Sequence, residues 1–147
     1  MNYTEIEIFY KTKPIKAKRP QIKRGEDVFN LMSSIPEMQR NVEYKELFYA
    51  LYLNKANEVL AIHKISEGVT DRTIVDIKFI MQGAILTNSS NMIILHNHPS
   101  GNLVPSESDK LLTNQIKKAA QLFNIDLLDN FTINADCYFS FLENNLI

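Results

Sequence analysis

The residues whose types and spacing most clearly suggest chemistry are two histidines and an aspartate in the second half of the 147-residue chain. His96 and His98 are two positions apart, so on an extended segment both imidazoles point the same way and can present nitrogens to one point. Asp109 follows a short loop that Pro99, Gly101 and Pro105 restrict in shape. Two histidines and one carboxylate are a typical catalytic zinc set, which leaves a fourth position for water. The spacing therefore predicts a metal site at His96, His98 and Asp109.

A simpler interpretation of part of this pattern stays open. Ser106 and Asp109 fit a helix capping box, in which a serine at the N-cap is followed three residues later by an acid. A single histidine at the end of a strand is also more often a hydrogen-bonded structural residue than a ligand. The paired histidines, the restricted loop and the returning carboxylate together favour the metal site.

The elements that must position these residues alternate between strands and helices. Residues 92–95 form a continuous apolar run, which is typical of a strand buried on both faces, and this run ends at the two histidines. The other expected strands cover residues 46–53, 59–65, 125–133 and 137–141. Two expected helices cover residues 26–33 and 106–123. A third expected helix follows a cap at Asp76 and carries on one face Ile77, Ile80, Met81, Ala84 and Ile85. This order predicts an α/β fold, with a mixed sheet flanked by helices.

Length and composition limit the remaining possibilities. A chain of this size is about one domain, and its apolar and aromatic content is that of a globular protein. Cys137 is the only cysteine, which excludes an intramolecular disulfide and a cysteine-based zinc knuckle. The first residues do not resemble a signal peptide, and no stretch is long enough to cross a bilayer, so we expect a cytoplasmic protein.

Charge is distributed unevenly along the chain. Two acids against seven basic residues give residues 1–24 a charge of +5, and the overall charge of −1 leaves −6 for the rest. Residues 5–10 begin with the alternation of an edge strand, the basic arm from Lys11 to Arg24 follows, and the core domain is expected to occupy residues 25–147. The arm could contact nucleic acid or another acidic surface, or it could be a solvated leader.

A family resemblance follows from these residues. His96-x-His98-Pro99, six further residues and Ser106-x-x-Asp109 match the JAMM signature HxHPx6SxxD, and the string from His96 to Gly101 resembles the RadC branch of this superfamily, whose domain is also called MPN or JAB. The likeness covers roughly the last hundred residues. It implies a single-domain layered fold of the cytidine-deaminase type and a zinc-dependent peptide or isopeptide hydrolase.

The resemblance also implies roles for individual residues. His96, His98 and Asp109 would hold zinc, Glu46 at the start of its strand would act as the general base, and the Ser106 hydroxyl would stabilise the oxyanion. In this interpretation helix capping and catalysis compete for the same atoms of Ser106 and Asp109. Asn97, Ser100 and Gly101 would shape substrate access or form the turn, His63 would be structural, and Cys137 would be a small buried residue.

Two departures from the RadC pattern leave alternatives open. Asn130 stands where such sequences usually have histidine, and we expect a basic arm in front of the domain where full-length RadC proteins have an N-terminal helical region. One alternative is therefore a nucleic-acid-binding protein associated with DNA repair, and another is a non-catalytic MPN-type scaffold. The substrate and the oligomeric state do not follow from the sequence.

Overall fold

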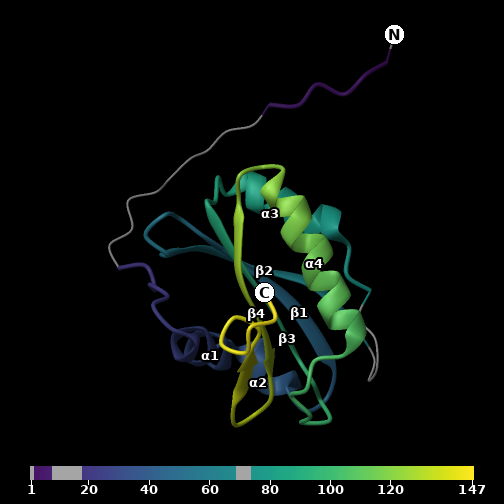
Figure 1. Cartoon of the computed structure of the whole chain (residues 1–147). Coiled ribbons are helices and arrows are strands. Elements are labelled where there is room, and N and C mark those ends of the chain that lie inside the picture. The colour runs from purple at the N-terminus through teal and green to yellow at the C-terminus, as the bar shows by residue number, and fades with distance from the viewer. Residues whose placement is uncertain (1, 8–17, 69–73) are drawn as a thin grey trace.

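The computed structural model describes residues 2–7, 18–68 and 74–147, and it folds the chain from residue 20 onward around one sheet (Figure 1). The elements follow in the order α1 (Gly25–Ser33), α2 (Pro36–Asn41), β1 (Glu46–Leu53), β2 (Val59–Gly68), α3 (Ile77–Leu86), β3 (Asn91–Asn97), α4 (Glu107–Gln121), β4 (Asp126–Ile133) and β5 (Tyr138–Ser140). The mixed α/β architecture expected from the sequence is thereby confirmed.

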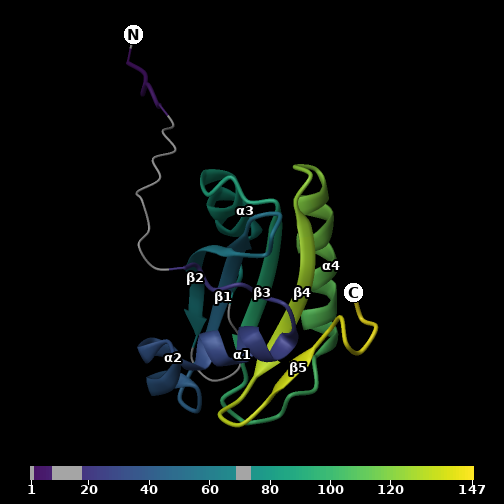
Figure 2. The same cartoon turned by 90° about the vertical axis from the view of Figure 1, so that its left-hand side faces the viewer.

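The five strands lie in the order β2-β1-β3-β4-β5, as Figure 2 shows from the side of α1. β1 pairs antiparallel with both β2 and β3, whereas β3 and β4 are parallel. A parallel pair needs a long crossover connection, and α4 supplies it between β3 and β4. β3 is therefore the central strand, and its apolar run is buried between the two helical layers.

Each face of the sheet carries its own helices. α3 and α4 cover one face, and α1 and α2 cover part of the other (Figures 1 and 2). Alternating side chains of β1 enter the two cores: Leu47 and Tyr49 pack on the side of α1 and α2, whereas Phe48 and Ala50 pack on the side of α3 and α4. A strand buried on both faces reads as an unbroken apolar run, which is why the sequence identified β1 and β3.

The structure corrects the burial expected for three side chains. Cys137 is exposed because it lies in the turn before β5, where the Asn134 side chain accepts its backbone N–H. Phe123 lies two residues beyond the end of α4 and is half exposed, as is Ile85 on α3. Helical spacing placed both residues on apolar faces, but neither belongs to the core cluster on that side of the sheet.

The N-terminal region is described only in part. An edge strand was expected over residues 5–10, but residues 5–7, the part of it that the structure describes, form no strand. Ile6 is 79% exposed. Residues 8–17, which include Lys11, Lys13 and Lys16 of the basic arm, lie outside the described residues. In the described residues, hydrogen bonds to the sheet begin at Pro20, whose carbonyl oxygen accepts the Val59 amide at 2.8 Å. Gln21 forms a bridge with Glu58, and Ile22 is already buried. In the described part of the chain, none of the helices has the length and apolar character needed to cross a membrane.

Candidate metal centre

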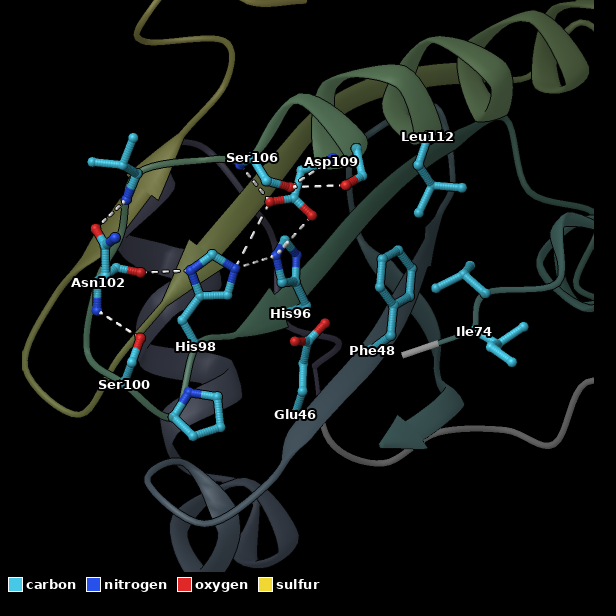
Figure 3. Close-up of a pocket in the computed structure, with 14 residues that line it drawn as sticks. Glu46, Phe48, Ile74, His96, His98, Ser100, Asn102, Ser106, Asp109 and Leu112 are labelled. Carbon is cyan, nitrogen blue, oxygen red and sulfur yellow. Dashed lines mark hydrogen bonds and ion pairs between the residues drawn. The ribbon is translucent and has the colours of Figure 1, made fainter. Parts of the chain in front are cut away.

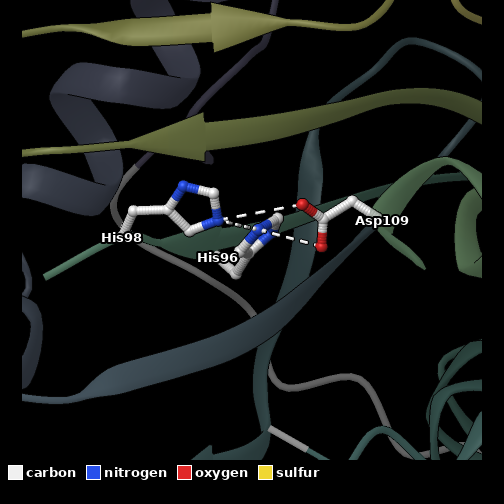
Figure 4. A group of neighbouring side chains, drawn as sticks. All are labelled: His96, His98 and Asp109. Carbon is white, nitrogen blue, oxygen red and sulfur yellow. Dashed lines mark hydrogen bonds and ion pairs between the residues drawn. The ribbon is translucent and has the colours of Figure 1, made fainter. Parts of the chain in front are cut away.

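The two histidines and the aspartate meet where the end of β3 faces the start of α4 (Figure 4). His96 belongs to β3, His98 directly follows it, and Asp109 lies in the first turn of α4. The Nε2 atoms of the histidines are 2.9 Å apart, and Asp109 Oδ1 lies 3.5 Å from His96 Nε2. Asp109 Oδ2 lies 3.8 Å from His98 Nε2. The structure thus brings together the three ligands that the sequence predicts.

The donor atoms fit a metal ion in both chemistry and spacing. One ligand atom from each residue lies within 4.8 Å of the others, and four-coordinate zinc with bonds of about 2.0–2.2 Å keeps its ligand atoms roughly 3.3–3.5 Å apart. His98 Nδ1 donates to the carbonyl oxygen of Asn102 at 2.5 Å, which leaves the lone pair on Nε2 facing the cluster. His96 is 1% exposed and stacks against Phe48, so its ring orientation is fixed by packing.

Asp109 is held as a carboxylate. Burial by itself would raise its pKa, but the hydrogen bond and charge of His96 and the bonds from the Ser106 amide and hydroxyl outweigh burial. The pKa of Asp109 therefore lies well below its usual range. A carboxylate that stays ionised is ready to bind a cation without first losing a proton.

The capping box is present together with the ligand cluster, which corrects the expectation that the two exclude each other. The Ser106 amide donates to Asp109 Oδ2 at 2.8 Å, and the Asp109 amide donates to Ser106 Oγ at 3.0 Å. Oδ1 of the same carboxylate remains directed at His96. Capping by the Ser106 amide uses Oδ2 of Asp109, so Oδ1 stays available for other partners.

Glu46 and Ser106 line the same cleft as the ligands (Figure 3). Glu46 opens β1, the strand beside β3, and Figure 3 shows its carboxylate directed toward His96. Phe48 on β1 and Leu112 on α4 form an apolar side of the cleft. The cleft has a volume of about 710 Å³, large enough to admit an extended chain segment beside the cluster.

Several residues around the site act through contacts that sequence spacing does not reveal. Asn97 is fully buried and faces away from the cleft toward the segment before β1, so it does not shape substrate access. Asn130, also buried, donates to Thr113 Oγ1 at 2.8 Å, and Thr113 Oγ1 donates to the backbone carbonyl of Asp109. Asn130 thus connects β4 to the first turn of α4. His63 contacts the Tyr52 hydroxyl and lies outside the cluster.

Comparisons with known proteins agree with this architecture. Residues 22–146 match the family described as RadC-like JAB domain. A UPF0758 protein of Pasteurella multocida is 36% identical over 126 residues, which cover 85% of this chain and 54% of that protein. A UPF0758 protein of Fusobacterium nucleatum is 39% identical over 112 residues, covering 75% of this chain and 48% of that protein. The chain spans about half the length of the curated relatives it matches, and the matched region contains Glu46 and the whole ligand cluster.

Proposed function

The chain belongs to the RadC-like JAB domain family, and from this premise we propose that it is a zinc-dependent hydrolase that cleaves an amide bond, in a peptide or an isopeptide. The observation that carries the proposal is the convergence of His96 Nε2, His98 Nε2 and an Asp109 carboxylate oxygen in a cleft that also contains Glu46 and Ser106. A set of two histidines and one carboxylate is suited to catalytic zinc because it leaves a coordination position open.

When bound by His96, His98 and Asp109, zinc would supply Lewis-acid polarisation of a carbonyl and a water acidified to near neutrality. The chain's own residues account for the remaining proton movements. Glu46 is the carboxylate in the cleft that is not part of the cluster, so it would accept the proton of the attacking water and return it to the leaving amine. Ser106 Oγ accepts the Asp109 amide and donates to Ser108 Oγ at 3.4 Å, and its hydroxyl would turn from Ser108 to donate to the developing oxyanion.

The first test is metal content. We expect about one zinc per chain after dialysis against zinc and removal of loosely bound metal, measured by elemental analysis and native mass spectrometry. His96→Ala should lose the metal because it removes one of three ligands. His63→Ala is the matched control, since His63 bonds to Tyr52 outside the cluster and its removal should leave the zinc in place. A wild-type protein that stays metal-free at saturating zinc would refute the proposal.

The second test is hydrolysis by the zinc-loaded protein. A mixture of linear peptides and a set of peptides joined through lysine side chains should be compared by mass spectrometry for new termini or released amines. Glu46→Gln should retain zinc and lose turnover, because the amide cannot accept the proton that the carboxylate takes. Cleavage that persists at the wild-type rate in Glu46→Gln would assign the base elsewhere. A zinc-loaded wild type that cleaves neither class would favour the non-catalytic scaffold.

A further inference from the structure

We infer that Asn97, the residue between the two histidine ligands, is a positioning residue that fixes Glu46 beside the metal centre. The inference deepens the proposed function and rests on it. It starts from a contrast within three consecutive residues: His96 and His98 direct their rings into the cleft, whereas the Asn97 side chain enters the opposite side of the sheet. There it binds the segment that leads into β1.

The Asn97 side chain directs three hydrogen bonds to the backbone around Glu46. Its Nδ2 donates to the carbonyl oxygens of Val42 and Lys45, each at 2.9 Å. Its Oδ1 accepts the backbone N–H of Leu47 at 2.8 Å. Asn97 is 0% exposed, so water does not compete for these bonds. One side chain thereby holds backbone groups on both sides of Glu46.

These contacts matter because the backbone ladder between β1 and β3 does not reach Glu46. Pairing between the two strands runs from Leu53 with Asn91 to Phe48 with His96, and it stops there. Glu46 and Leu47 pair only with β2, the outer strand. The Asn97 side chain therefore replaces the missing ladder and joins the first residues of β1 to the strand that carries the ligands.

The geometry requires a side-chain amide of this length. Aspartate has the same shape but only acceptor oxygens, so it would face two carbonyl oxygens that it cannot bind. Glutamine would place one more methylene in a site with no exposed surface. Alanine would leave two carbonyls and one N–H without their partner. A displacement of about 1 Å at a catalytic group can lower a rate by roughly a hundredfold, so a loosened Glu46 would disable the base while the metal ligands stay in place.

The test uses binding to the cobalt-loaded full chain, followed by visible absorption, with two probes. Acetohydroxamate gives up a proton when it binds a metal and needs a neighbouring base, whereas azide binds as an anion and needs none. In Asn97→Ala, we expect metal affinity and azide affinity within about threefold of wild type. Acetohydroxamate affinity should fall by about tenfold or more, as in Glu46→Gln, and the double variant should show no further loss.

A matched control is available on the same strand. Asn91, at the other end of β3, donates through its side-chain amide to Asn57 Oδ1 at 2.7 Å and ties β3 to the turn between β1 and β2. Asn91→Ala removes a similar amide contact far from the cluster, so it should leave the affinity for both probes unchanged. Amide hydrogen exchange should accelerate at residues 42–47 in Asn97→Ala only.

Three outcomes would overturn the inference. Wild-type hydroxamate affinity in Asn97→Ala, with a loss in Glu46→Gln, would show that Glu46 is placed without Asn97. Fully additive losses would show that Asn97 acts by another route. Parallel loss of metal and azide would show that Asn97 supports the ligands instead.

Where Asn97→Ala does not fold, Asn97→Ser provides the same comparison, with a hydroxyl that can satisfy the Leu47 amide. Failure of the proposed function looks different, because the wild type would then bind no metal, or Glu46→Gln would leave hydroxamate binding intact.

Discussion

Asp109 has two tasks, and its two carboxylate oxygens divide them. Oδ2 receives the Ser106 amide and completes the helix cap, whereas Oδ1 is directed at His96. The cap orders the carboxylate through contacts within the chain, so the start of α4 itself would meet part of the cost of ordering Asp109 for a metal. One residue of the first helical turn thus both completes the cap and faces the two histidines.

Two substitutions should separate these tasks. Asp109→Asn should abolish zinc binding because it removes the charged ligand. It keeps an oxygen that can accept the Ser106 amide, so the unfolding free energy of the metal-free protein should change little. Asp109→Ala should lose zinc and also destabilise the metal-free protein by about 1 kcal/mol, because the half of the capping box that the Asp109 carboxylate supplies is lost. Zinc titration and urea denaturation of the metal-free variants measure the two effects. Equal stability of Asp109→Asn and Asp109→Ala would show that the cap contributes nothing.

Ser106 should behave differently from the ligands. Its hydroxyl caps α4 and faces the cleft, but it is not one of the three clustered donors. Ser106→Ala should therefore retain zinc, lose about 1 kcal/mol of stability and lower the rate of amide hydrolysis by about a hundredfold or more. Ser106→Thr keeps the hydroxyl and serves as the control. Loss of zinc in Ser106→Ala would mean that the cap holds Asp109 in place for the metal.

Local spacing was sufficient to predict that His96, His98 and Asp109 lie together, and it was insufficient for the residues that hold them in place. His96, His98 and Asp109 lie within one short stretch, so chain geometry alone relates them. Asn97 acts on carbonyl groups more than fifty residues upstream, whereas local spacing predicts for it only a role in the turn or in substrate access. The hydrogen bond from Asn130 to Thr113, across the β4–α4 interface, likewise joins two residues that are not neighbours in the sequence. Such partnerships depend on strand order, which the pattern of apolar residues leaves undefined.

At the scale of elements, α3 lies unusually close to β1. A Cβ added at Gly83 would overlap the Tyr52 hydroxyl, which donates to the carbonyl of Ile80 at 2.9 Å in the same helix. Tyr52 is 1% exposed, and its hydroxyl contacts both His63 Nδ1 and the Ile80 carbonyl, so a shift of its ring would disturb two contacts. Glycine at this position lets the helix rest directly on the strand that begins with Glu46.

Gly83→Ala should therefore destabilise the protein although alanine favours helices. The expected loss is about 1–3 kcal/mol from overpacking, against a gain of about 1 kcal/mol in helix propensity. Gln82→Ala, an exposed neighbour on α3, is the control and should change stability by less than about 0.5 kcal/mol. Thermal and urea unfolding measure both. A stabilised Gly83→Ala would mean that α3 can shift away from Tyr52 without cost.

The attachment of α2 to the sheet should depend on pH. Lys64 Nζ on β2 donates to Glu37 Oε1 on α2 at 2.7 Å. This bond lowers the Glu37 pKa below 4.5. Burial opposes the shift, and the hydrogen bond from the Tyr49 hydroxyl adds to it. The contribution of this pair is fully present above pH 4.5 and disappears as the pH falls through the lower folded-state pKa. It should amount to about 0.5 kcal/mol, because both side chains remain accessible to water.

Urea denaturation of wild type and Lys64→Met from pH 7 to pH 3 tests this pair. The wild type should be the more stable of the two at pH 7, and the difference should shrink toward pH 3 as Glu37 becomes protonated. The double variant with Glu37→Gln supplies the reference in which the pair is absent. A difference that grows as the pH falls would contradict the assignment.

At the scale of the whole molecule, positive charge is concentrated in the first 24 residues, and the JAB domain carries the negative balance. The ligand cluster lies at the junction of β3 and α4, inside that domain. Any duplex-DNA binding by this chain should therefore come from the arm, weaken steeply with salt, and be independent of the metal centre. Lys18→Glu with Arg19→Glu should abolish it, whereas His98→Ala should leave it unchanged. Salt-insensitive binding in a fluorescence anisotropy titration would contradict this view.

The helix cap that holds Asp109 also bears on how quickly a metal bound at this centre would exchange. His98 is fixed by the Asn102 carbonyl, His96 by stacking on Phe48, and Asp109 by Ser106, through contacts within the chain itself. We therefore expect loading to need encounter and desolvation with little rearrangement of these side chains, and release to leave the fold in place. Such a protein would gain and lose its metal reversibly as the concentration of free metal rises and falls. The fraction of the protein that carries metal would then depend on the metal available, instead of being fixed when the protein is made.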